Sequence, residues 1–227
     1  AAIQNDVPNY WLMSSGEVYQ TPEIVPTDET VSLKVPNPLN PRYSYGGGKI
    51  ISELYAINYG RKNFQKVSIV RPHNVYGPDM GWEHVIPQFI TRVCDQIERV
   101  PDGKLPFAIQ GDGSQTRAFC YIDDFVEGCH LAFSKGDNLG IYHVGTMEEV
   151  KILTLAELVI SHFSRSPVFE FNDEPEGQTQ RRCPSINKVS KLGYVPKFSL
   201  SQGLKLTVDW YKENIHLRDT NTFASSS

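Results

Sequence analysis

A tyrosine and a lysine four positions apart, in the segment Tyr45-Gly-Gly-Gly-Lys49, are residue types that could carry out a proton transfer. On a helix, side chains with this spacing lie on one face. A lysine ammonium near a tyrosine hydroxyl favours the phenolate, which can remove a hydroxyl proton while hydride leaves the same carbon. By itself the pair is better explained as two exposed side chains of an ordinary helix, because this spacing often arises by chance.

The three glycines between Tyr45 and Lys49 bear on whether this segment is a helix or a loop. Each costs about 1 kcal/mol relative to alanine in a helix interior, so the run Gly46–Gly48 opposes helix formation. A flexible loop would explain them, and so would the close approach of a nicotinamide ring or a neighbouring helix to the backbone. Apolar residues recur at helical spacing immediately afterwards, from Ile50 to Ile57, which favours close approach within a helix.

A second signal is the run Ser14-Ser15-Gly16-Glu17, directly after a predicted strand. Active-site groups of open α/β sheets lie at the carboxyl ends of strands. The hydroxyl of Ser15 can therefore hydrogen-bond the oxygen that is oxidised and complete a set with Tyr45 and Lys49. The alternative is a turn of small residues that ends the strand. Each signal is weak alone, and together they indicate an active site.

The elements that position these residues follow an α/β order. Residues 10–14 predict a buried strand, residues 20–42 a long loop, residues 45–59 a helix that stops at Gly60, and residues 67–70 a strand covered on both faces. A helix between two buried strands implies a parallel crossover unit.

Later segments predict shorter elements. We expect strands over 107–110 and 141–145 and a helix over 123–133. Thr154-Leu-Ala-Glu157 and Ser199-Leu-Ser-Gln202 are predicted capping boxes, each at the start of a helix. The polar tail 219–227 is expected to be disordered.

Composition places the chain among ordinary globular proteins, with 227 residues, 40% of them hydrophobic, and a formal net charge of -4. The absence of a dense Lys/Arg run argues against nucleic-acid binding, and no apolar run is long enough to span a membrane. The cysteines are scattered, which favours free thiols in a cytoplasmic protein over disulfides or a metal site; they are Cys94, Cys120, Cys129 and Cys183.

Several motifs in order resemble one family. Ser15, Tyr45 and Lys49, followed by Arg71-Pro-His-Asn-Val-Tyr-Gly-Pro78, are similar to the extended short-chain dehydrogenase/reductases, specifically the nucleotide-sugar epimerases and dehydratases. The resemblance covers roughly residues 1–214, including the segments 111–124, 181–184 and 192–196. It implies an α/β fold: the C-terminal part of a Rossmann-like, doubly wound parallel sheet with a smaller mixed α/β substrate-binding domain.

The resemblance also implies a domain division. Residues 1–78 correspond to an incomplete NAD-binding Rossmann portion and residues 79–218 mainly to a substrate-binding portion, with 118–146 returning to the Rossmann sheet.

The family's chemistry is a transient oxidation with NAD as cofactor. The resemblance implies that Tyr45 takes a proton from a sugar hydroxyl, usually at C4, that Lys49 hydrogen-bonds the nicotinamide ribose, and that Ser15 orients the sugar oxygen. It places further residues beside the cofactor, namely Ser14, Pro72 and His73.

The implied partner is a nucleotide-diphosphate sugar. Arg117 and Arg182 suit its diphosphate because a guanidinium can bind phosphate oxygens through two parallel hydrogen bonds. Asn74 and Val85 match the family's substrate contacts. The complete protein is also expected to form a homodimer through two helices per subunit.

One family feature is missing. No strand followed by a GxxGxxG turn holds the cofactor's pyrophosphate. We therefore expect this chain alone to bind NAD poorly, to be inactive, and to leave a strand edge unpaired near residues 10–13.

The reaction type rests on Glu17. Epimerisation through a 4-keto sugar is favoured, because dehydratases usually carry Asp-Glu where this chain has Gly16-Glu17. A 4,6-dehydratase or a uronic acid decarboxylase, with Glu17 as added acid/base, is the runner-up. The residues are also compatible with a non-catalytic binding or regulatory protein and with a net NADPH-dependent reductase.

Overall fold

The computed structural model describes residues 1–173 and 179–218, and the predicted disordered tail lies outside the described residues. The chain divides into two compact units. Unit 1 comprises Ala1–Val75, Gln115–Val150 and Gly177–Phe198, and unit 2 comprises Tyr76–Ser114, Lys151–Glu176 and Ser199–Ser227. Residues 179–198 thus group with unit 1, whereas the sequence placed them in the second portion.

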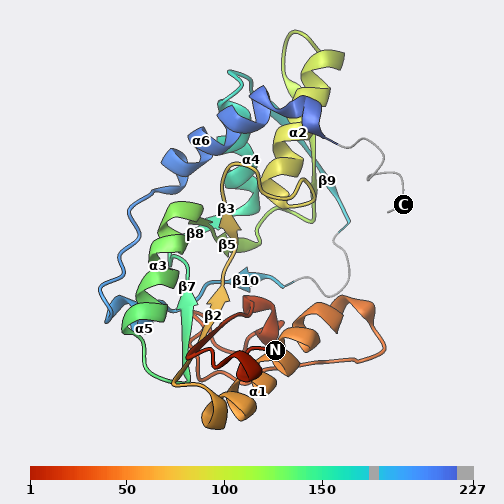
Figure 1. The fold of residues 1–227 in the computed structure, drawn as a ribbon. Helices are drawn as coiled ribbons and strands as arrows, with labels where there is room; N and C mark the ends of the chain where they lie inside the picture. The colour runs from red at the N-terminus through yellow and green to blue at the C-terminus, as the bar shows by residue number, and fades with distance from the viewer. Residues whose placement is uncertain (174–178, 219–227) are drawn as a thin grey trace. The chain divides into compact units, whose positions relative to one another are not determined.

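A three-stranded parallel sheet forms the centre of unit 1 (Figure 1). Its order is β1 (Asn9–Met13), β2 (Lys66–Pro72) and β7 (Gly140–Val144). The helix α1 (Ser44–Asn63) connects β1 to β2, which pair in parallel from Asn9↔Lys66 to Met13↔Val70. The predicted parallel crossover is confirmed, and so is the α/β class.

Both faces of β2 are covered, as its unalternating apolar run predicts. Val67 and Ile69 pack with Ala56 of α1 in one buried cluster. Val70 packs with Cys129 of α3 (Ile122–Lys135) in another, which also includes Val189 of α5 (Asn187–Ser190). Because successive strand residues point to opposite faces, α1 and α3 cover opposite sides of the sheet.

The prediction that residues 10–14 are buried is wrong for most of β1. Trp11 is 56% exposed and Met13 is 41% exposed. Within the described residues β1 pairs with β2 alone, so it lies at the edge of the sheet. The expected unpaired edge is therefore confirmed, and the edge position explains the exposure of Trp11 and Met13. The prediction of burial is wrong because strand residue types indicate a strand but not what covers it.

A second small sheet, whose residues belong to unit 1 except for Lys151, has the order β10 (Arg181–Arg182), β5 (Thr116–Ala118), β8 (Glu149–Lys151). The remaining short elements of the first half are the 3-10 helices η1 (Ile3–Asn5), η2 (Gly16–Tyr19) and η3 (Pro41–Tyr43). Two further short strands are β3 (Val75–Tyr76) and β6 (Cys120–Tyr121).

Unit 2 pairs β4 (Leu105–Gln110) in parallel with β9 (Pro167–Asn172). Its helices α2 (Val85–Arg99), α4 (Ile152–Ser161) and α6 (Leu200–Glu213) pack against one another, and η4 (Ile215–Leu217) follows α6. Phe89 and Phe107 meet edge to face with ring centroids 5.3 Å apart, which joins α2 to β4.

Only one of the two predicted capping boxes is correct. Ser199 and Gln202 make both reciprocal hydrogen bonds at the start of α6. In contrast, Thr154 lies inside α4, which begins at Ile152 after the N-cap residue Lys151. The apolar residues before Thr154 already belong to the helix, so the motif matches by residue type without standing at a helix start.

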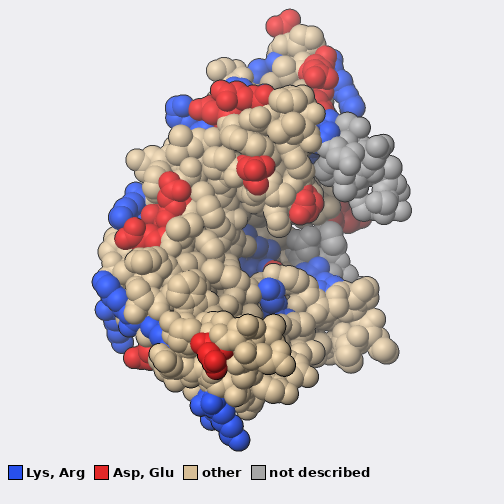
Figure 2. All heavy atoms as spheres, in the orientation of Figure 1, with Lys and Arg blue, Asp and Glu red and all other residues tan. Residues whose placement is uncertain are grey.

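Acidic and basic side chains are both spread over the face seen in Figure 2. Over residues 1–173 and 179–218, no helix has both the length and the apolar character needed to cross a membrane.

Candidate active site

The first turn of α1 packs directly on η2, and Gly46 makes this possible. A Cβ atom added at Gly46 would lie 2.4 Å from Gln20 Nε2 and 2.7 Å from the Glu17 carbonyl oxygen. The predicted close approach at the glycine run is thus confirmed at Gly46, with η2 as the neighbour. At Gly48 no atom lies within 4 Å of the added Cβ, so packing does not require that glycine.

Tyr45 and Lys49 lie on the same side of α1. The Lys49 Nζ atom is 5.6 Å from the centroid of the Tyr45 ring, and it donates a 2.9 Å hydrogen bond to the Met13 carbonyl oxygen. Tyr45 is 57% exposed. The lysine therefore connects the phenol ring to the carboxyl end of β1, where the predicted active-site turn begins.

Ser15 is the N-cap residue of η2. Its Oγ atom accepts a 3.1 Å hydrogen bond from the Glu17 backbone N–H. That bond uses a lone pair and leaves the hydroxyl hydrogen available for donation. Since Gly46 packs on the Glu17 backbone, Ser15 stands at the same junction as the first turn of α1.

Ser14 has a different environment from the one expected on the cofactor side. It is buried, and its hydroxyl donates to Glu53 Oε1 in the interior of unit 1. Glu53 in turn accepts from Arg71 Nε at 2.8 Å and from Arg71 Nη2 at 2.6 Å.

The same buried network continues across the sheet to β7. Arg71 Nη1 donates to the Tyr19 hydroxyl, which lies 2.7 Å from His143 Nε2. Burial raises the pKa of Tyr19 to about 12, although the adjacent Arg71 charge acts in the opposite direction. The network therefore ties η2, α1, β2 and β7 together beneath the candidate site.

Sequence reasoning missed this network. One feature of the sequence could have revealed it: the charged residue Arg71 stands at the end of a strand that is predicted to be covered on both faces. A buried charge needs a partner of opposite charge. Glu53 also falls four positions after Lys49, on a helix whose inner face is otherwise apolar or small.

His73 is buried at the end of β2, next to Gly16. A Cβ atom added at Gly16 would lie 2.6 Å from His73 Cε1, so the imidazole ring leaves no room for a side chain at position 16. The ring meets His143 edge to face at 4.7 Å. Burial, followed by the neighbouring His143, Arg182 and Arg71, holds the pKa of His73 well below its usual value.

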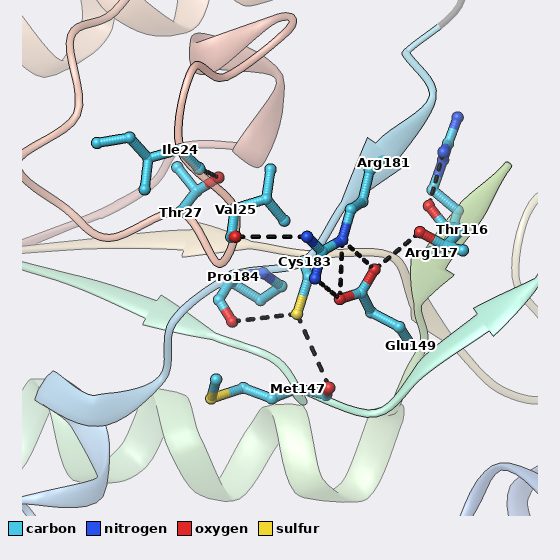
Figure 3. A network of polar contacts seen from close by, with 10 residues as sticks. All are labelled: Ile24, Val25, Thr27, Thr116, Arg117, Met147, Glu149, Arg181, Cys183 and Pro184. Carbon is cyan, nitrogen blue, oxygen red and sulfur yellow. Dashed lines mark hydrogen bonds and ion pairs between the residues drawn. The ribbon is translucent and has the colours of Figure 1, made fainter.

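The two predicted phosphate-binding arginines are neighbours in one sheet. Arg182 of β10 and Arg117 of β5 are register partners in a parallel pair. Arg117 Nη1 donates to the Thr116 carbonyl oxygen at 2.8 Å. Figure 3 shows this strand pair around Arg181, whose guanidinium binds Glu149, and Glu149 also accepts from Thr116 Oγ1 at 2.8 Å.

Arg182 binds Glu17 through both terminal nitrogens. Nη1 contacts Oε1, and Nη2 lies 3.0 Å from Oε2. Nη2 also donates to Thr179 Oγ1 at 3.2 Å. Glu17, which is expected to add acid/base chemistry, is therefore paired with Arg182, which is expected to bind the diphosphate.

The remaining predicted site residues lie at the ends of secondary-structure elements or in the turns between them. Pro72 ends β2 and is half-buried. Asn74 has a positive φ of 41°, and its Nδ2 atom donates to the Ala118 carbonyl oxygen at 3.1 Å. Val85 is the first residue of α2 and belongs to unit 2.

The chain is similar in sequence to curated enzymes that act on nucleotide sugars. The chain is 34% identical over 209 residues to UDP-glucuronic acid decarboxylase 1 of Arabidopsis thaliana, covering 91% of this chain and 46% of that protein. It is 31% identical over 222 residues to GDP-mannose 3,5-epimerase 1 of Oryza sativa subsp. indica, covering 97% and 57%. The chain thus spans about half the length of these curated relatives.

A solved structure shares the fold. It is a double mutant of dTDP-glucose 4,6-dehydratase from Streptomyces venezuelae with NAD bound, with a TM-score of 0.80 and 28% identity over 95% of this chain and 63% of that one. The model of the NAD dependent epimerase/dehydratase family matches residues 1–145, which include Ser15, Tyr45, Lys49 and Arg117. The chain belongs to the NAD dependent epimerase/dehydratase family.

Proposed function

We propose that the whole protein is an NAD-dependent nucleotide-sugar epimerase that acts through a transient 4-keto sugar. One observation carries the proposal: Lys49 Nζ lies 5.6 Å from the Tyr45 ring and 2.9 Å from the Met13 carbonyl oxygen, next to the turn that contains Ser15. This arrangement brings a tyrosine phenol, a lysine ammonium and a serine hydroxyl to one strand end, the three groups that a proton transfer from a sugar hydroxyl requires.

The residues present fit NAD in part. Tyr45 is exposed, and Lys49 uses one of the three ammonium hydrogens on Met13, which leaves two for ribose hydroxyls. Ser14 fits less well, because its hydroxyl is already donated to Glu53. When bound, NAD supplies the hydride acceptor for the oxidation and the hydride donor for the return step.

The roles of the chain's own side chains follow. The Tyr45 oxygen takes the proton from the sugar hydroxyl, and Lys49 stabilises the negative charge on that oxygen before transfer. The Ser15 hydroxyl orients the sugar oxygen. The diphosphate is bound by Arg117 and by the amide of Asn74, with Arg182 as a further substrate contact.

The proposed partner is a nucleotide-diphosphate sugar, and the experiment uses the full-length protein with NAD. UDP-glucuronic acid, GDP-mannose and UDP-glucose are incubated separately, and the products are analysed by mass spectrometry and NMR. Epimerisation leaves the mass unchanged and inverts a ring carbon. Tyr45→Phe should abolish that product without weakening nucleotide-sugar binding; unchanged turnover would leave only a binding role.

Lyase chemistry is the second candidate, since Glu17 is held beside the site by Arg182 and one relative is a decarboxylase. Loss of one water or one carbon dioxide from the product would support it. Glu17→Gln separates the two reactions: lyase activity should fall by about 100-fold or more, the range for a general acid or base, and epimerisation should persist.

We also propose that the protein forms a homodimer through α1. Tyr55 and Tyr59 are 61% and 58% exposed and their rings lie 5.8 Å apart, beside Ile51, which is 55% exposed. Light scattering of the wild type and of Tyr55→Glu tests this, with a dimer expected only for the first.

A further inference from the structure

A small cavity lies inside unit 1, beside the candidate catalytic turn. It is partly open and has room for a group about the size of one water molecule or hydroxyl, and its walls come from three segments. Gly16 and Tyr19 belong to η2, His73 follows β2, and Arg182 belongs to β10.

Two of the lining residues carry a buried nitrogen without a hydrogen-bond partner. Among the residues that line the cavity, these atoms are His73 Nε2 and Arg182 Nε. His73 is only 7% exposed. A buried polar atom left unpaired is costly, and native proteins usually satisfy such atoms with a protein group, an ordered water or a bound ligand. Two such nitrogens on residues that line one cavity indicate that the cavity takes a polar group.

The two nitrogens restrict the chemistry of that group. Arg182 Nε can only donate a hydrogen bond, so the group must offer a lone pair. His73 is neutral and presents either an N–H or a lone pair, so the group can accept from it or donate to it. The charge of Arg182 is already balanced by Glu17, so no net negative charge is required. A hydroxyl meets all three conditions.

The position of the cavity indicates which hydroxyl. Gly16 lies between Ser15 and Glu17, and His73 contacts it so closely that no Cβ fits. A group that enters the cavity is therefore next to the residue proposed to orient the oxidised oxygen. We propose that His73 and Arg182 bind a hydroxyl on a carbon other than the one oxidised, which makes the cavity a subsite that selects sugar configuration. This inference rests on the proposed function.

The test is a binding titration of the full-length protein loaded with NAD. The probes are UDP-glucuronic acid and GDP-mannose, each compared with its free nucleotide, UDP or GDP. For the sugar that binds, His73→Phe should weaken affinity by about 3- to 10-fold, the loss typical of one hydrogen bond, and should leave the free nucleotide unaffected. His130→Phe, on the exposed side of α3, is the matched control and should change neither affinity.

Deoxy analogues of the sugar identify the hydroxyl. The analogue that lacks it should bind the wild type more weakly and should bind His73→Phe and the wild type equally. His73→Phe should also keep or raise the thermal unfolding midpoint of the free protein, because it removes an unpaired nitrogen and keeps a ring. Equal sugar affinities for His73→Phe and the wild type would overturn the subsite and leave the proposed function intact. If neither sugar binds the wild type more tightly than its free nucleotide, the subsite is overturned, and the turnover assay with the three nucleotide sugars decides the proposed function separately.

Discussion

Glu53 of α1 and Arg71 of β2 form an ion pair that is almost fully enclosed, with 2.6 Å between Oε2 and Nη2 and 3% of each side chain exposed. The pair also receives the hydroxyl of Ser14, so it joins the helix that carries Tyr45 to the ends of two strands. A buried pair is costly to break because the remaining charge has no water around it.

We predict that Glu53→Gln lowers the free energy of unfolding by about 3–5 kcal/mol, since Arg71 then lacks a buried counter-charge. Urea unfolding followed by circular dichroism measures it. Glu127→Gln is the matched control, because Glu127 pairs with Lys197 at 3.4 Å where the side chains are 48% and 64% exposed. That change should cost less than about 1 kcal/mol. Similar losses in both variants would contradict the prediction.

The two ends of the glycine run should respond in opposite directions to alanine. Gly48→Ala meets no neighbouring atom and should stabilise the protein by about 0.5–1 kcal/mol, because alanine favours a helix interior. Gly46→Ala should destabilise it, since the new Cβ meets the Glu17 backbone at 2.7 Å and η2 must move.

The same displacement gives a functional readout. Turnover of the full-length protein should fall in Gly46→Ala, because the displacement of η2 separates Ser15 from Tyr45. Turnover should be retained in Gly48→Ala. If Gly46→Ala is as stable and as active as Gly48→Ala, α1 does not depend on this contact with η2.

Residue patterns predicted the elements better than their surroundings. The apolar patterns of the segments that form β1, α1 and β2 each predicted a strand or a helix. Helical spacing alone was enough to predict that Tyr45 and Lys49 share a face. The exposure of Trp11 depends on what lies beyond β1, which residue types in β1 do not encode. Likewise, the partner of Arg71 is 18 positions away and is specified by packing rather than by a motif.

The capping boxes show the same limit on a local scale. Ser199→Ala should cost about 0.5–2 kcal/mol, because Ser199 accepts from the Gln202 backbone N–H at the start of α6. Thr154→Ala should be neutral or stabilising, since Thr154 lies inside α4 and alanine has the higher helix propensity. Thermal unfolding of both variants measures this difference, and equal destabilisation would mean that Thr154 has a capping role after all.

Acid should destabilise unit 1 through His143, which is fully buried in β7. Its Nδ1 atom lies 3.3 Å from the Ser185 carbonyl oxygen and therefore carries the hydrogen, so Nε2 accepts from the Tyr19 hydroxyl. Burial, followed by the charge of Arg71, lowers the pKa of His143 to about 3. The neutral form is thus the folded form, and protonation breaks the contact with Tyr19.

The direction of the pH effect follows from that lowered pKa. The unfolded chain binds a proton at His143 below its ordinary pKa of 6.5, and the folded chain binds it only near pH 3. The free energy of unfolding should therefore decrease as the pH is lowered through this interval. This residue contributes up to about 1.4 kcal/mol per pH unit. His143→Phe should be less stable at neutral pH, because Tyr19 loses its acceptor, but its pH dependence should be shallower. Urea unfolding of both proteins at several pH values between 4.5 and 6.5 measures the two slopes. Parallel slopes would show that His143 is already protonated in the folded protein or is not buried there.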